Sequence, residues 1–271
     1  MSEILLKDGF AATPERCLWH AGSKTAVVAD LHLGAEPELS RRGIFMPDVS
    51  SKALRQAWGR MCERVGGGGR IVVAGDLFDV PAAGREAVEM ARELFRSVPA
   101  GCEVVLIPGN HDPSEAVLRE MFEGVTVAVA VMVGGYTVIH GHESGHTVGF
   151  GEGEWVGKGK VRQWVPRGMI VGHQHPAVVV GNRVQSAKMI CFGVCELEAR
   201  TAVGGKLGRR VPLILLPTFS RAPLGSTLSE NHWIVDMPRP LEEDVRVLGI
   251  VEVDGGRVLD FGTLASLRLP F

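Results

Sequence analysis

The stretch Thr25–His32 (TAVVADLH) joins an unbroken apolar run to an acid and a histidine. Thr25–Ala29 has the continuous hydrophobic character of a strand that is buried on both faces of a sheet. The same pattern recurs at Arg70–Ala74 (RIVVA), which leads into Gly-Asp, and at Glu103–Ile107 (EVVLI), which leads into Pro-Gly-Asn-His. Three buried strands that each end in polar side chains predict a parallel sheet with a site at its carboxyl edge.

Each of these predicted strands is followed in the sequence by a segment with a helical pattern. Residues 48–65, 85–98 and 114–122 carry apolar side chains at helical spacing, and the first of these segments ends at the glycine run 66–69. Strands that alternate with helices predict an α/β fold.

The second half of the chain is richer in strands. Short apolar runs predict strands over residues 125–132, 136–139, 169–171, 177–180, 188–194, 212–216, 246–253 and 258–261. Gly134-Gly135 is typical of a hairpin turn, whereas 206–210 (KLGRR) is interpreted as a charged loop. We expect a second sheet that packs on the first, with residues 1–271 forming one domain in which 176–271 completes the second sheet and the substrate rim.

Composition narrows the class of protein. The chain has 271 residues, of which 45% are hydrophobic and 22% charged, as in ordinary globular proteins. Its net charge of −2 gives no general attraction to nucleic acid or membrane. Five scattered cysteines favour reduced thiols, and neither a membrane-spanning run nor a signal segment is evident. We therefore expect a cytoplasmic protein with no membrane partner.

Polar residues follow five successive predicted strands. Taken alone, each fragment is ordinary turn chemistry, but their joint occurrence at one sheet edge favours a site. The fragments are Asp30-Leu31-His32, Gly75-Asp76-Leu77-Phe78-Asp79, Gly109-Asn110-His111-Asp112, His140-Gly141-His142 and Gly172-His173-Gln174-His175. Carboxylate, imidazole and amide donors without cysteine suit Mn²⁺, Fe²⁺, Zn²⁺ or Co²⁺. About seven donors are too many for one ion and suit two ions that share a carboxylate, an arrangement used in phosphoryl transfer.

In this order the motifs DxH, GDxxD, GNHD, HGH and GHxH resemble the signature of calcineurin-like metallophosphoesterases. The resemblance implies an α/β fold with a two-sheet β-sandwich flanked by helices. It also implies hydrolysis of phosphodiester bonds, or alternatively phosphomonoester bonds, by in-line attack of a metal-bound hydroxide. The cofactors would be two divalent ions, with Mn²⁺ favoured over Fe, Zn, Co or Ni.

The resemblance assigns a role to each motif residue. Asp30, His32 and His175 would bind one ion. Asn110, His140 and His173 would bind the other, and the carboxylate of Asp76 would bridge the two ions. His111 would protonate the leaving oxygen or stabilise the charged phosphate, oriented by Asp79. Asp112 and His142 lie next to these residues in the sequence, and we expect them to hold the ligands in place rather than to bind an ion.

A narrower resemblance bears on the substrate. The stretches VVADLHLG (27–34), SRRGI (40–44), GHQHPAV (172–178) and LLPTF (215–219) are similar to a small prokaryotic branch that includes ligase-associated DNA-damage-response phosphoesterases and their archaeal relatives. Arg41, Arg42 and Arg221 are candidate contacts to phosphate or nucleic acid, with solvated surface arginines as the alternative.

Three functions follow as hypotheses. The first is a nuclease associated with DNA repair. The second is a phosphodiesterase or phosphatase that acts on nucleotides or related small molecules. The third and least favoured is a non-catalytic scaffold, because every ligand position and His111 are present.

Overall fold

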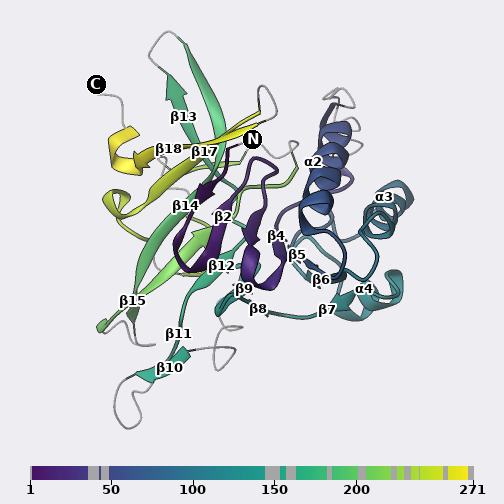
Figure 1. The fold of residues 1–271 in the computed structure, drawn as a ribbon, viewed down its shortest axis with the longest axis horizontal. Coiled ribbons are helices and arrows are strands. Elements are labelled where there is room, and N and C mark those ends of the chain that lie inside the picture. Colours follow the sequence, from purple (N-terminus) through teal and green to yellow (C-terminus); the bar gives the residue numbers. More distant parts are fainter. Residues whose placement is uncertain are drawn as a thin grey trace.

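Two β-sheets lie face to face, and helices cover the outer face of one of them (Figure 1). The computed structural model describes residues 2–35, 43, 49–143, 153–156, 163–181, 185–200, 206–220, 225–228, 233–237, 239–252 and 256–267. The predicted α/β fold with a two-sheet sandwich is confirmed. Among these residues, no helix is both long and apolar enough to cross a bilayer.

The first sheet has seven strands in the order of the sequence. Its strands are β1 (Ile4–Leu5), β2 (Phe10–Ala12), β3 (Leu18–His20), β4 (Thr25–Val28), β5 (Arg70–Ala74), β6 (Glu103–Ile107) and β7 (Thr126–Val127). Strands β4 to β7 are parallel, as the buried apolar runs of β4, β5 and β6 predict for those three, whereas β1 to β4 pair antiparallel. The three N-terminal strands were not predicted, because runs of two or three residues show no clear periodicity.

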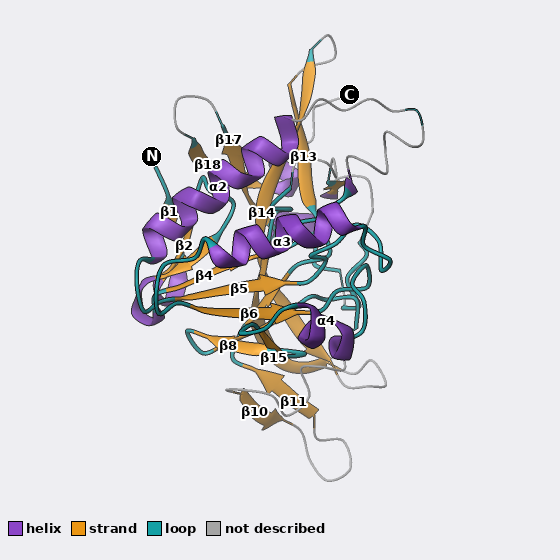
Figure 2. Ribbon diagram, turned by 90° about the vertical axis from the view of Figure 1, so that its right-hand side faces the viewer, coloured by secondary structure: helices purple, strands orange, loops and turns teal. Residues whose placement is uncertain are grey.

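Three helices pack on the outer face of this sheet: α2 (Val49–Val65), α3 (Arg85–Arg96) and α4 (Glu115–Met121). Figure 2 shows α2 and α3 running beside β4, and α4 near the end of β6. Trp58 on α2 is fully buried, and its indole nitrogen donates to the carbonyl of Leu94 on α3. The predicted apolar faces therefore form the core between helices and sheet.

The second sheet contains most of the remaining strands. In spatial order these are β16 (Ser226–Thr227), β13 (Pro176–Gly181), β14 (Ser186–Arg200), β15 (Lys206–Leu215), β12 (Met169–Val171), β9 (Tyr136–Ile139) and β8 (Val131–Val133); β17 (Arg246–Val251) pairs with β14, and β18 (Arg257–Thr263) pairs with β17. A separate hairpin consists of β10 (Gly153–Val156) and β11 (Gln163–Pro166).

Two sequence interpretations of this half were wrong. The predicted strand over 125–132 is divided, since β7 joins the first sheet and β8 joins the second. The KLGRR stretch is the start of β15 rather than a loop, because its backbone continues the pairing with β14. The Gly134-Gly135 turn between β8 and β9 was predicted correctly, with Val133 opposite Tyr136.

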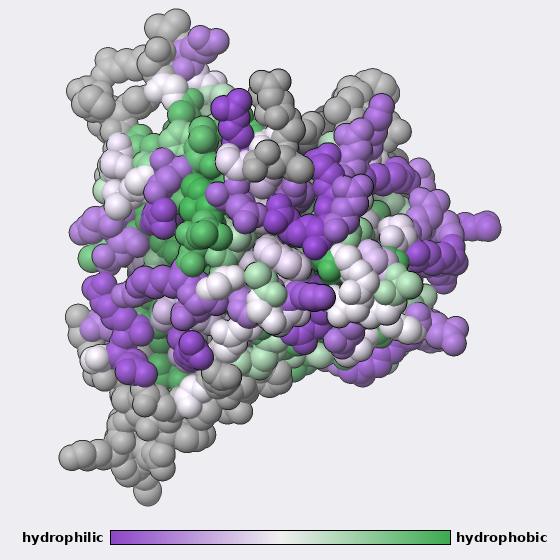
Figure 3. Space-filling model, viewed as in Figure 1, coloured by the Kyte–Doolittle hydropathy of each residue, from purple (hydrophilic) through white to green (hydrophobic). Residues whose placement is uncertain are grey.

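Apolar side chains from both sheets form the core between them. Phe10 and Val72 of the first sheet share this core with Tyr136, Phe192 and Leu248 of the second. Figure 3 shows polar side chains over the helical side of the molecule and an apolar strip near β14 and β17. Face-to-face packing brings the carboxyl ends of strands from both sheets to one edge.

Candidate metal centre

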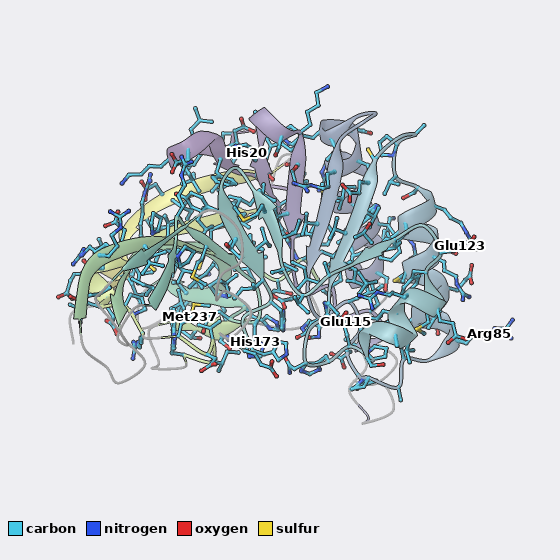
Figure 4. All side chains as sticks on the ribbon, turned by 90° about the horizontal axis from the view of Figure 1, so that it is seen from below. His20, Arg85, Glu115, Glu123, His173 and Met237 are labelled. Atoms are coloured by element: carbon cyan, nitrogen blue, oxygen red, sulfur yellow. The ribbon has the colours of Figure 1, made fainter. Side chains whose placement is uncertain are left out.

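The predicted site residues lie where strands of both sheets end. Asp30, Asp76, Asn110, His140 and His173 follow β4, β5, β6, β9 and β12, respectively. Figure 4 shows the labelled His173 at the edge where these loops meet. The loops after β4 and β5 are joined by backbone bonds from Asp30 N to the Gly75 carbonyl and from His32 N to the Asp76 carbonyl, both 3.0 Å. The link between the sheets is equally direct, because His173 N donates to the Asp30 carboxylate at 3.1 Å.

One group of side chains could hold a metal ion: Asp30, His32, Asp76 and His175. Nε2 of His32 lies 3.1 Å from Nε2 of His175, and the latter lies 3.3 Å from Oδ1 of Asp30. Asp30, Asp76 and His32 are buried, with 0%, 1% and 5% of their surface exposed. Such a buried set of carboxylates and imidazoles is costly unless its members are paired or bind a cation.

A second group contains Asp76, His140 and His173. Nε2 of His140 lies 3.4 Å from Oδ2 of Asp76 and 3.1 Å from Oδ1 of Asn110. The rings of His140 and His173 are 4.8 Å apart. Asp76 belongs to both groups.

The donors fit divalent ions. Metal–ligand bonds of about 2.0–2.3 Å place neighbouring ligand atoms roughly 3 Å apart, as several of these atoms are. A ligating imidazole also needs its other nitrogen to carry the proton. Nδ1 of His140 donates to the Ala74 carbonyl at 3.0 Å, so Nε2, which faces Asp76 and Asn110, is the nitrogen that would bind an ion. Oδ1 of Asp79 lies 3.2 Å from Nδ1 of His32, as an electrostatic contact rather than an aligned hydrogen bond.

Backbone strain is concentrated at this centre. In the described chain, eight non-glycine residues have positive φ, and five of them are predicted ligands: Asp30, His32, Asp76, His173 and His175. The left-handed region is uncommon for residues with a Cβ and persists where surrounding bonds over-determine it. A pattern of residue types does not reveal these angles, so this strain was not predictable from the sequence.

Two glycines make room for the side chains. A Cβ on Gly75 would lie 2.1 Å from Nδ1 of His140, and one on Gly109 would lie 2.1 Å from Oδ1 of Asp76. Both positions therefore require glycine.

His111 lies beside the first group, with its ring 5.3 Å from that of His32. Its backbone N donates to Oδ1 of Asp76 at 2.9 Å, and its Nδ1 lies 2.6 Å from the backbone carbonyl oxygen of Asp79. The expected orientation of His111 by Asp79 thus comes from the carbonyl, whereas the Asp79 carboxylate faces His32.

Asp112 joins two of the motif loops. Its carboxylate accepts from Phe78 N at 3.0 Å and from Gly109 N at 2.9 Å. Burial raises the pKa of Asp112 to about 6, against the lowering effect of these bonds. Asp112 therefore supports the loop that carries Asn110 and His111.

The electrostatics of the centre follow from burial opposed by close charge pairs. Burial favours the neutral acid, but the contacts with His140, His111 N and His32 outweigh it and hold the pKa of Asp76 well below its usual range. Burial likewise opposes protonation of His140, yet Asp76 and Asp30 raise its pKa to about 9. Burial and the neighbouring His140 lower the pKa of His173 to about 4.

Of the remaining predicted site residues, the structure describes His142 but not the three arginines. The His142 ring lies beside the second group, 5.2 Å from the His140 ring and 6.2 Å from the His173 ring. Arg41, Arg42 and Arg221 lie outside the described residues. So does most of residues 141–159, a glycine-rich stretch whose pattern predicts a long loop.

Sequence reasoning missed residues that hold the ligand loops. Thr218 is fully buried, and its hydroxyl donates to the Asp30 carbonyl at 3.0 Å. Buried Arg16 donates to the neighbouring Phe219 carbonyl at 2.9 Å and pairs with Glu252. Gln174, also fully buried, accepts from the backbone N of Ile234 at 3.0 Å. Only the position of Gln174 between two histidines could have drawn attention to it.

A comparison with protein families matches residues 23–183 to the calcineurin-like phosphoesterase family, which is more than half of the chain. The chain belongs to this family. It is accordingly a metal-dependent phosphoesterase, and the metal-binding groups described above lie within the matched residues, 23–183. No curated protein matches the chain in sequence.

Solved structures provide a second comparison for this phosphoesterase. The nuclease MPE from Pseudomonas putida is similar with a TM-score of 0.51 at 17% identity, over 95% of this chain and 99% of that one. Vps29 from Entamoeba histolytica, in a complex with Zn²⁺, matches with a TM-score of 0.32 at 14% identity, over 88% of this chain and 99% of that one. The nuclease comparison supports the fold.

Proposed function

We propose that this phosphoesterase hydrolyses phosphodiester bonds with two divalent metal ions. The observation that carries the proposal is the sharing of Asp76 between the two groups of donors. Asp30, His32 and His175 would hold one ion and Asn110, His140 and His173 the other. With mixed oxygen and imidazole donors, Mn²⁺ is the favoured ion, and Fe, Zn, Co or Ni are chemically compatible.

When bound, two such ions make water a better nucleophile and offset charge on the phosphoryl oxygens. The chain itself supplies the proton for the leaving group. A carbonyl oxygen only accepts, so the contact with Asp79 keeps the proton of His111 on Nδ1. Nε2 of His111 is then the atom that delivers a proton to the leaving oxygen when the ring is protonated.

We further propose nucleic acid as the substrate, in the setting of DNA repair that the sequence resemblance implies. Similarity to a nuclease over 95% of the chain supports this choice. The net charge of −2 favours a few local phosphate contacts over a broad basic surface, and Arg41, Arg42 and Arg221 are proposed for them. On this proposal residues 1–271 act as one cytoplasmic domain.

The test uses metal-stripped protein reconstituted with Mn²⁺. Hydrolysis is measured on an aryl phosphodiester, an aryl phosphomonoester, a nucleoside cyclic phosphate, and single- and double-stranded DNA. We expect diesters to be cleaved in preference to monoesters and DNA in preference to small diesters. Preference for the cyclic nucleotide would assign the enzyme to small molecules instead. Full diesterase activity of Asp76→Asn would refute the two-ion site.

A further inference from the structure

Gln174 connects the ligand loops to a distant part of the chain. It stands between His173 and His175, and none of its surface is exposed. Its Oε1 atom accepts a hydrogen bond from the backbone N of Ile234 at 3.0 Å. A buried side chain amide therefore ties the loop after β12 to a segment about sixty residues further on.

The same segment also holds the loop after β9. We call Trp233–Met237 the bracket. Asp236 N donates to the carbonyl of Gly141, the residue that follows His140, at 2.9 Å. Between these two contacts Val235 is buried, and its Cγ1 lies 3.1 Å from where a Cβ on Gly141 would be.

The bracket is itself well supported. The indole nitrogen of Trp233 donates to the Met237 carbonyl at 2.7 Å, which closes the segment on itself. Val235, Trp233 and Met237 pack with the apolar cluster on the outer face of the second sheet. Figure 4 shows His173 and Met237 on the same side of the molecule. The bracket thus joins both second-sheet loops to a packed core.

We infer that Gln174 is a positioning residue that works through the bracket to fix His140, His173 and His175 for metal binding. The inference rests on the proposed function, because it takes these histidines as ligands. His173 and His175 have φ values of 59° and 46°, a conformation that surrounding bonds must maintain. The Ile234 bond is placed between the two strained residues and supplies such a restraint.

Energetic coupling between the bracket and the ions must act in both directions. Residues that hold metal ligands in place typically change metal affinity by about 10–100-fold when they are lost. By linkage, metal binding must then stabilise the bracket to the same extent. A residue that only fills space would show neither effect.

Two substitutions separate hydrogen bonding from packing. Gln174→Met keeps the length of the side chain but removes the acceptor, whereas Gln174→Glu keeps an acceptor for Ile234 N. Gln56→Met, on an exposed position of α2, is the matched control. Dissociation constants for Mn²⁺ are measured by calorimetry on metal-stripped proteins. We expect Gln174→Met to weaken binding by about tenfold or more, and Gln174→Glu to recover most of that loss.

The opposite order, with Met harmless and Glu damaging, would show a packing role and overturn the inference. Should Gln174→Met fail to fold, hydrogen exchange on the unmodified protein decides. Amides of Ile234 and Asp236 are expected to exchange at least tenfold more slowly with Mn²⁺ than without it, and equal rates would refute the coupling. If the unmodified protein bound no Mn²⁺ at all, the proposed function would fail; normal binding by Gln174→Met would refute only the inference.

Discussion

Nδ1 of His111 lies 2.6 Å from the backbone carbonyl oxygen of Asp79, while the carboxylate of Asp79 lies 3.2 Å from Nδ1 of His32. Asp79 therefore contacts two neighbouring histidines, one through its backbone carbonyl and the other through its carboxylate. A backbone carbonyl survives any side-chain substitution, so the orientation of His111 does not depend on the Asp79 carboxylate. The contact with His32 does depend on it.

Replacing Asp79 should consequently affect metal binding more than proton transfer. Asp79→Ala removes the carboxylate beside His32 and is expected to weaken Mn²⁺ binding by about 10–100-fold. At saturating Mn²⁺, the pH dependence of kcat should match that of the unmodified enzyme, because His111 keeps its partner. Calorimetry and a pH–rate profile test the two halves separately. A displaced acidic or basic limb of the profile would mean that the carboxylate acts on His111 after all.

Substitution of His111 should produce the reverse pattern. His111→Ala removes the proton donor but leaves the backbone N that contacts Asp76, so Mn²⁺ affinity should stay within about threefold. We expect kcat to fall by about 10²–10⁴ for an alkyl diester, whose leaving oxygen needs protonation. For a p-nitrophenyl ester the loss should be much smaller, since that group leaves as an anion. An equal loss for both esters would argue against a proton donor and for stabilisation of the phosphate charge.

The sequence alone predicted the strands and residue types that build this centre better than the details that make it work. The apolar runs of β4, β5 and β6 are continuous because both sheet faces are covered, so their positions were clear. The polar residues that follow these strands were evident because each set comes directly after a clear apolar run. The divided segment at β7 and β8 was not, because periodicity does not show where a strand leaves one sheet for another.

The supporting contacts were beyond sequence reasoning because they depend on tertiary structure. Thr218 reaches Asp30 across 188 positions, and Gln174 reaches Ile234 across 60. Such residues have no local pattern, since any buried polar side chain near a ligand loop can fill the role. The role of the Asp79 carbonyl was likewise hidden, because a motif records side chains and not the backbone.

Metal binding should release protons and strengthen as the pH rises. Asp76 and Asp30 raise the pKa of His140 to about 9 against the effect of burial, so in the metal-free protein this imidazole is protonated at pH 7. Its Nε2 must lose that proton to coordinate an ion. The apparent affinity for Mn²⁺ should thus rise by up to about tenfold per pH unit from pH 7 toward pH 9 and then level off. Calorimetry in buffers of different ionisation enthalpy measures the released protons; no release at pH 7 would contradict the charged state of His140.

The tight packing behind Asp76 gives the last prediction. In Gly109→Ala the new Cβ would lie 2.1 Å from Oδ1 of Asp76 and 2.4 Å from its backbone N, so the Asp76 loop has to move. We expect this variant to lose the high-affinity Mn²⁺ site and about 1–3 kcal/mol of the free energy of unfolding, measured with urea. The matched control is Gly59→Ala, in the middle of α2, where a Cβ would meet no atom within 4 Å. That substitution should add about 0.5–1 kcal/mol and leave metal binding unchanged, because alanine favours the helix over glycine. Normal Mn²⁺ binding by Gly109→Ala would show that the loop tolerates the displacement, and that glycine is not needed there for Asp76 to reach both ions.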